Sequence, residues 1–136
     1  MRTLVFAAVL LLTACGPSPD KAAVDAGPVI IETIAKAEMI VLDPHIKEGV
    51  FTVFDFYADW CPPCKKLDKS LIDMKKLYGD RMVVYKMDIV DWESAMAKGF
   101  GIKDLPFLMV YNPDRTILKA GPSSEALPAL IAALNK

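Results

Sequence analysis

The sequence has little of the chemistry that metal sites and nucleic-acid interfaces use. Its 136 residues include three cysteines and one histidine, which leaves little for a metal cage. The 16 basic and 17 acidic residues give a net charge of −1, so the basic excess expected of a nucleic-acid binder is absent. The length fits one domain and excludes a large multidomain enzyme. The charged fraction of 24% is ordinary for a folded domain and argues against disorder.

The N-terminus is apolar, but its apolar run is too short to span a membrane. Residues 4–12 are all apolar, and these nine residues fall well below the roughly 20 that a spanning helix needs. Arg2 precedes the run and small residues follow it. This arrangement predicts a secretory signal peptide over residues 1–14.

Cys15 ends a Leu-Thr-Ala-Cys sequence that resembles the bacterial lipoprotein box, in which the cysteine is lipidated and begins the mature protein. The resemblance implies a periplasmic protein held by lipid at a bacterial membrane, inner or outer. The alternative is an ordinary signal peptide with Cys15 as a bystander. Residues 15–28 contain three prolines and two glycines and predict a flexible tether, which leaves residues 29–136 as the folded domain.

Strand and helix patterns alternate along the folded domain. We expect strands at 38–42, 50–57, 82–89, 107–111 and 116–120, and helices at 61–78, 92–98 and 123–135. A further helix or 3₁₀ turn near Ile34 or Ile46 stays open. Pro128 must lie in the first turn of the last helix or displace its start. This order of elements predicts an α/β fold with a mixed central sheet and helices on both faces.

Cys61 and Cys64 form a Cys-Pro-Pro-Cys sequence where a predicted strand leads into a helix. In an α/β pattern, a C-x-x-C at this place indicates redox chemistry. Because the N–H groups and dipole of a helix N-terminus stabilise an anion, we expect a lowered pKa for the Cys61 thiol. Cys64 lies one turn further on and can resolve a mixed disulfide. Pro62 and Pro63 remove two N–H donors, so we expect the lowering to be moderate.

These residues resemble the thioredoxin superfamily, and the resemblance extends from about Glu38 to the C-terminus. The superfamily has an acidic residue six positions before the first cysteine, where this chain has Asp55. It has a lysine on the next strand, which Lys86 matches, and a cis-proline opposite the cysteines, which Pro106 matches. The resemblance implies a thioredoxin fold and a thiol–disulfide oxidoreductase that acts on protein thiols and disulfides with no cofactor beyond its dithiol.

The resemblance also implies a role for each matching residue. Asp55 would accept the proton of the second cysteine, with its pKa raised by burial and Lys86 as a nearby countercharge. The backbone of Leu105, before Pro106, would pair with an extended substrate chain, and Trp60 would shape the docking surface. The alternatives are a solvated acid at a sheet end, a surface lysine, a proline that only starts a strand, and a tryptophan that only packs.

The chain departs from the thioredoxin pattern at two places. Pro-Pro stands between the cysteines where Gly-Pro is usual, and Phe107 follows the predicted cis-proline where threonine is common. Both differences affect substrate range and redox potential. The short body, without the insertion of the periplasmic thiol oxidase, favours a reductase, which would draw electrons from a transmembrane electron transporter. A thiol oxidase or isomerase of the same fold is the alternative.

Other interpretations use the two cysteines differently. A purely structural Cys61–Cys64 disulfide would close a very small loop and stabilise little. A zinc site needs four ligands, and only His45 and carboxylates remain to supply them. A non-catalytic assembly factor could bind copper through the same two cysteines. We expect Trp92 and the methionines to fill the core rather than to bind copper.

Overall fold

The computed structural model describes residue 29 and residues 31–136. The predicted signal peptide, Cys15 and the tether over residues 15–28 therefore lie outside the described residues. In the part of the chain that is described, no helix is both long enough and apolar enough to cross a membrane.

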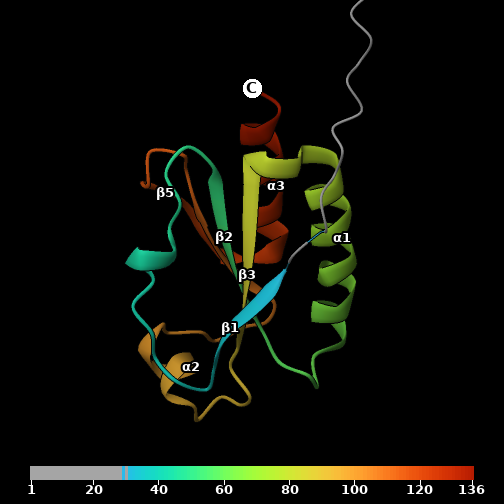
Figure 1. Ribbon diagram of the computed structural model, residues 1–136. Helices are drawn as coiled ribbons and strands as arrows, with labels where there is room; N and C mark the ends of the chain where they lie inside the picture. The colour runs from blue at the N-terminus through green and yellow to red at the C-terminus, as the bar shows by residue number, and fades with distance from the viewer. Residues whose placement is uncertain (1–28, 30) are drawn as a thin grey trace, which may run out of the picture.

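The described residues form a five-stranded mixed sheet, as the sequence predicts (Figure 1). Its strands are β1 (Glu32–Lys36), β2 (Phe51–Tyr57), β3 (Met82–Asp88), β4 (Phe107–Tyr111) and β5 (Ile117–Pro122). The strand order is β1-β3-β2-β4-β5. β3 runs parallel to β1 and β2, whereas β4 runs antiparallel to β2 and β5. The carboxyl ends of β1, β2 and β3 therefore share one end of the sheet.

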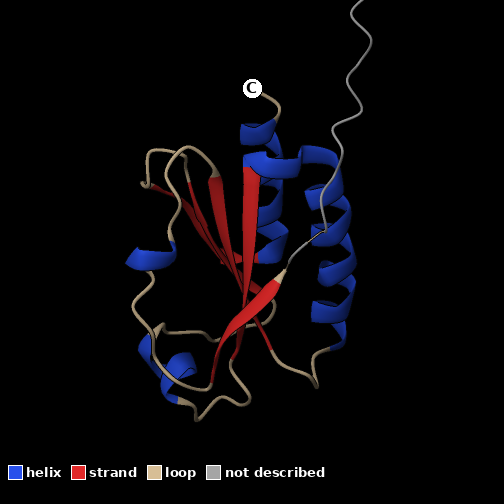
Figure 2. Cartoon of the chain, viewed as in Figure 1, coloured by secondary structure: helices blue, strands red, loops and turns tan. Residues whose placement is uncertain are grey.

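Helices cover both faces of the sheet, which confirms the predicted arrangement (Figure 2). The α-helices are α1 (Pro62–Tyr78), α2 (Ala95–Gly99) and α3 (Ser123–Leu134), and two 3₁₀ turns are η1 (Asp43–His45) and η2 (Gly79–Arg81). Helices α1 and α3 pack on one face, and α2 packs on the other. η1 lies near Ile46, at one of the two places where the sequence left a turn open.

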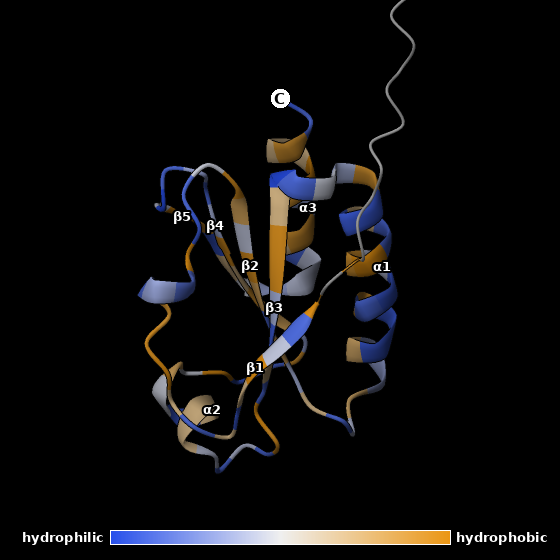
Figure 3. Ribbon diagram, viewed as in Figure 1, coloured by the Kyte–Doolittle hydropathy of each residue, from blue (hydrophilic) through white to orange (hydrophobic). Residues whose placement is uncertain are grey.

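Two apolar clusters, one on each face, hold the sheet between the helices. On the α1–α3 face, Val53 of β2 packs with Leu71 and Leu130; on the α2 face, Phe54 packs with Met96. Successive strand residues point to opposite faces, so β2 contributes to both clusters. Six of the seven β2 residues are buried. Figure 3 shows the hydrophobic colour along β3 and the hydrophilic colour over much of α1.

The first strand lies elsewhere than predicted. It spans Glu32–Lys36, and the residues expected as a strand at 38–42 form an irregular segment instead. The strand ends at Lys36, because the positive φ of 62° at the next residue, Ala37, breaks the extended conformation. Met39 and Val41 made residues 38–42 look like a strand, but both side chains are exposed.

Of the last two helices, α2 starts later than predicted, whereas α3 starts at the predicted residue but holds Pro128 in another place. The helix expected at 92–98 begins at Ala95, because the Ser94 side chain accepts a hydrogen bond from the Ala97 N–H and caps it. α3 begins at Ser123, so Pro128 lies in the second turn and not the first. Pro128 and Ser124 are both exposed, so water can bond the Ser124 carbonyl that the proline leaves without an intrahelical donor.

Candidate active site

Cys61 and Cys64 form a disulfide at the N-terminus of α1. Cys61 is the N-cap residue, and its sulfur accepts a hydrogen bond from the Cys64 N–H at 3.2 Å. Pro62 and Pro63 occupy the first two helical positions, where an N–H has no intrahelical partner. The Cys64 N–H is therefore the donor that can stabilise a Cys61 thiolate, as expected of a helix N-terminus. Both cysteines are buried.

The peptide bond between Leu105 and Pro106 is cis, as the resemblance implies. Phe107, the next residue, pairs with Phe56 near the end of β2, five residues before Cys61. The sheet register thus places Pro106 at the same end of the sheet as the disulfide. The Leu105 N–H donates to the Asp104 carboxylate at 2.9 Å, so a substrate that used this N–H would replace that bond.

Asp55 is fully buried on β2, which rules out a solvated acid at the sheet end. Neither carboxylate oxygen has a hydrogen-bond partner among the described residues. Burial raises the pKa of Asp55 from 3.8 to about 7; the positive charge of Lys86 opposes the rise and the negative charge of Asp68 adds to it. At neutral pH this carboxyl can both take up and release a proton.

Lys86 is the register neighbour of Asp55 on the adjacent strand β3, so the expected proximity of the two is confirmed. Its ammonium, however, forms an ion pair with Asp68 of α1. It also lies over the ring of Tyr57, 3.9 Å from the ring centroid. The side chain is only 14% exposed, so Lys86 is not an ordinary surface lysine.

Trp60 stands directly before the disulfide and is 52% exposed. Its indole N–H donates to the Val90 carbonyl at 2.6 Å, and its ring meets that of Trp92 edge-on at 5.6 Å between centroids. Trp92 is 41% exposed, so the expectation that it fills the core is wrong. Of the methionines expected there, Met82 and Met87 are fully buried.

Trp92 is the residue of this surface that sequence reasoning missed. It lies four residues after β3 ends, and the carboxyl ends of the parallel strands β2 and β3 meet at one end of the sheet. This meeting of the strand ends was the signal that could have placed Trp92 near the cysteines. Val90 has a positive φ of 63° and is the centre of a γ-turn that the Asp91 N–H closes onto the Ile89 carbonyl at 2.7 Å. Asp88 fixes this turn by accepting the Val90 N–H at 2.9 Å.

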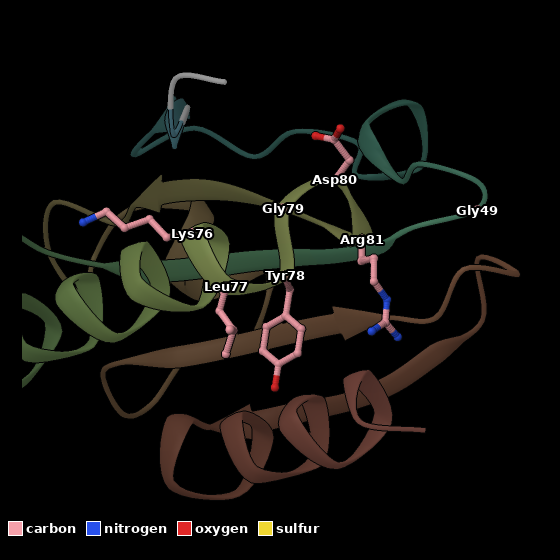
Figure 4. Close-up of a pocket in the computed structure, with 7 residues that line it drawn as sticks. All are labelled: Gly49, Lys76, Leu77, Tyr78, Gly79, Asp80 and Arg81. Carbon is pink, nitrogen blue, oxygen red and sulfur yellow. The ribbon is translucent and has the colours of Figure 1, made fainter. Parts of the chain in front are cut away.

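The structure also has a hollow that lies away from the disulfide (Figure 4). Its volume is about 470 Å³, and residues at the C-terminal end of α1, among them Leu77 and Arg81, line it together with Gly49. The disulfide lies at the opposite end of this 17-residue helix, roughly 25 Å away along its axis. The hollow is therefore separate from the redox site. In the described part of the chain, no group of three or more histidine, cysteine or acidic side chains could hold a metal ion.

Comparisons with known proteins agree with this geometry. The thioredoxin family matches residues 32–135 of the chain. Thioredoxin of Bacillus subtilis is 30% identical over 103 residues, which cover 76% of this chain and 96% of that protein. Thioredoxin H4 of Arabidopsis thaliana is 29% identical over 93 residues, covering 68% and 77%.

Solved structures show the same fold. The thioredoxin of Malassezia sympodialis superposes with a TM-score of 0.56 at 19% identity, covering 79% of this chain and 92% of that one. A chain from the complex of ferredoxin:thioredoxin reductase and thioredoxin f2 superposes with a TM-score of 0.52 at 27% identity, covering 65% and 81%. The predicted thioredoxin fold is therefore confirmed. The chain belongs to the thioredoxin family and is a thiol–disulfide oxidoreductase that carries the Cys61–Cys64 pair.

Proposed function

We propose that the protein reduces protein disulfides in the periplasm while a lipid on Cys15 holds it at a bacterial membrane. The observation that carries the chemistry is the Cys61–Cys64 pair at the start of α1, where the Cys64 N–H already donates to the Cys61 sulfur and can stabilise a thiolate there. The connection from α1 to β3 consists of the short turn η2, and that from β3 to β4 holds only the five-residue α2. A compact body of this kind favours a reductase over an oxidase with an inserted helical domain.

The reaction transfers two electrons from the dithiol to the substrate. The Cys61 thiolate attacks one sulfur of the substrate disulfide; a Cys61–substrate bond forms, and the departing substrate thiolate takes a proton. Cys64 then gives its proton to the Asp55 carboxylate, and its sulfur attacks the Cys61 sulfur. The Cys61–Cys64 disulfide forms and the second substrate thiolate leaves, taking a proton in turn. Asp55 thus acts as the proton acceptor, as its pKa of about 7 allows.

Substrate docking uses the surface around the disulfide. The exposed Trp60 flanks it, and the backbone of Leu105, before Pro106, pairs with an extended substrate segment. After each turnover the disulfide needs two electrons from a donor, and we propose a transmembrane electron transporter for a periplasmic protein. One structural relative comes from a complex of a thioredoxin with its reductase, which supports a dedicated donor.

The equilibrium reduction potential of the Cys61–Cys64 pair tests the direction. In dithiothreitol or glutathione buffers we expect a value near that of thioredoxin, about −270 mV. A value near about −120 mV, typical of a strong periplasmic oxidant, would instead make the protein a thiol oxidase. Cys61→Ser and Cys64→Ser variants serve as controls, since neither can form the pair.

Cell fractionation tests the location. With the full chain expressed in a bacterium, we expect the wild-type protein in the membrane fraction and metabolically labelled with palmitate. The Cys15→Ser variant should lose the label and leave that fraction. Equal labelling of both proteins would contradict lipidation at Cys15.

A further inference from the structure

Lys86 has two carboxyl groups within reach and pairs with the outer one. Asp55 and Lys86 are register neighbours on parallel strands, so their side chains point to the same face of the sheet. Val53, two residues before Asp55, packs against α1 and α3, which identifies this face as the α1 side. Asp68 lies on α1 over the same face, and it is Asp68 that forms the ion pair.

The ion pair sits at the rim of the core. The Lys86 side chain is 14% exposed and the Asp68 side chain 34%, whereas Asp55 has no exposure at all. A cavity of about 180 Å³ opens beside the pair, lined by Asp68, Lys86, Ile31 and Ile72. The ammonium also contacts the Tyr57 ring, a second contact that orients it. Asp68 and Tyr57 thus hold the cation at the rim of the core, without a hydrogen bond to the buried carboxyl.

Few charged groups face Asp55 from the elements that pack around it. From β3 the charged group is Lys86, and from α1 it is Asp68. Tyr57 is the titratable side chain that follows on β2 itself. β4 supplies the apolar Leu108 opposite Asp55, and the α3 residues buried on this face are the apolar Ala126, Leu130 and Leu134. After burial itself, the Lys86 ammonium therefore has the largest effect on the pKa of Asp55, and it opposes the rise.

We propose that Asp68 is a positioning residue for the thiol–disulfide exchange: it holds the Lys86 ammonium away from Asp55, which leaves the buried carboxyl free to exchange a proton with the Cys64 thiol. This inference rests on the proposed function of Asp55 as proton acceptor. A lysine paired directly with Asp55 would keep the carboxylate charged and make it a poor base. With Asp68 in place, the proton moves from the Cys64 sulfur to an Asp55 oxygen, and the thiolate that remains attacks the Cys61 sulfur.

Titration of the Asp55 carboxyl tests the proposal. We would label aspartate with ¹³C and follow the Asp55 carboxyl signal by NMR in the oxidised protein, where the cysteines do not titrate. In Asp68→Asn we expect the midpoint to move toward acid by about one pH unit or more, because Lys86 turns toward Asp55. Asp68→Glu keeps the charge and should keep the wild-type midpoint.

Two further variants separate the position of Lys86 from the loss of one charge. Asp73→Asn removes the same charge from α1, but Asp73 pairs with the exposed Lys76, so the Asp55 midpoint should stay in place. In a Lys86→Met background, Asp68→Asn should move the midpoint by less than half as much as in the wild type. An equal movement in both backgrounds would overturn the proposal, because Asp68 would then act by its own charge alone.

The kinetic readout is the pH dependence of disulfide reduction. In the wild type we expect the rate of mixed-disulfide resolution to fall as the pH drops below the Asp55 midpoint. In Asp68→Asn this fall should occur at a lower pH, together with the Asp55 midpoint. An unmoved midpoint in a protein that reduces disulfides would overturn the role of Asp68. If the midpoint differs between the wild type and Asp68→Asn, but neither protein reduces disulfides, the proposed function is overturned instead.

Discussion

The buried carboxyl of Asp55 links the stability of the oxidised protein to pH. Its pKa is about 7 in the folded protein and 3.8 in the reference state, so the folded protein binds more protons between these values. The contribution of Asp55 to the free energy of unfolding is then fully present below about pH 4 and is lost as the pH rises through about 7. This difference between the two pKa values of Asp55 corresponds to a change of at most about 4 kcal/mol in the free energy of unfolding.

Asp55→Asn should remove this dependence. We expect the variant to match the wild type near pH 4 and to be more stable at pH 8, by up to about 4 kcal/mol, because no charge remains to be buried. Urea denaturation of the oxidised proteins at both pH values measures this. Asp73→Asn, on the exposed side of α1, is the control and should follow the wild type. A wild-type protein whose stability relative to Asp55→Asn is the same at both pH values would contradict the prediction.

Trp92 should contribute to substrate binding through its contact with Trp60. Trp92→Ala removes an edge-on aromatic pair, an interaction of about 0.5–1.5 kcal/mol, and leaves Trp60 less fixed. We expect KM for a disulfide-bonded protein substrate to rise roughly two- to tenfold with little change in kcat. Trp92→Phe, which keeps a ring, should lie close to the wild type. A fall in kcat at constant KM would show that Trp92 acts on the chemistry and not on docking.

Individual residues differ in how far the sequence could identify them. The C-x-x-C motif identified the two cysteines, and the resemblance to the thioredoxin superfamily then implied Asp55 and Pro106, because that superfamily has an acidic residue and a cis-proline at the matching positions. Trp92 belongs to an irregular segment without periodicity, and its place beside Trp60 depends on a γ-turn with positive φ at Val90. A β-branched residue rarely adopts that conformation, and no sequence pattern indicates it.

At the scale of elements, the ends of α1 were predictable because particular residues set them. Prolines begin the helix, and Gly79 ends it with φ 54° and ψ −127°, a conformation that side chains strongly disfavour. We expect Gly79→Ala to lower the free energy of unfolding by roughly 1–3 kcal/mol in urea denaturation. Gly121→Ala is the matched control: an added Cβ would meet its nearest neighbour, a Lys119 side-chain carbon, at an ordinary 3.7 Å. Similar losses in both variants would argue against a conformational cause.

β1 shows why some elements could not be predicted. Its sequence, Glu-Thr-Ile-Ala-Lys, is mixed in polarity, and none of its residues is fully buried. It pairs only with the second half of β3, starting from Glu32 opposite Tyr85. A strand of this kind forms because a distant partner offers hydrogen bonds, and that partner lies some fifty residues away in the sequence.

At the scale of the whole molecule, the order of the strands was beyond local reasoning, although the class of fold was not. Alternating strand and helix patterns predicted a mixed sheet with helices on both faces. β3 lies between β1 and β2 because the connection through α1 returns the chain to a parallel strand beside β2. The connection through α2 then leads to β4, which is antiparallel to β2 on its other side and leaves β2 at the centre. The resemblance to the thioredoxin superfamily implied this topology, because the members of that superfamily share one fold.

The central position of β2 has a consequence for motion. Its amide and carbonyl groups bond to β3 on one side and β4 on the other, whereas β1 and β5 lie at the edges of the described sheet. Amide hydrogen exchange should therefore be slowest in β2, with protection approaching the global free energy of unfolding, and faster in β1. Native-state exchange in low denaturant measures this ranking, and equal protection of β1 and β2 would contradict it. Brief local unfolding of the edge strands would then leave β2, which leads into the Cys61–Cys64 pair, in its folded conformation. The two sulfurs therefore stay aligned between turnovers even while the edges of the sheet open.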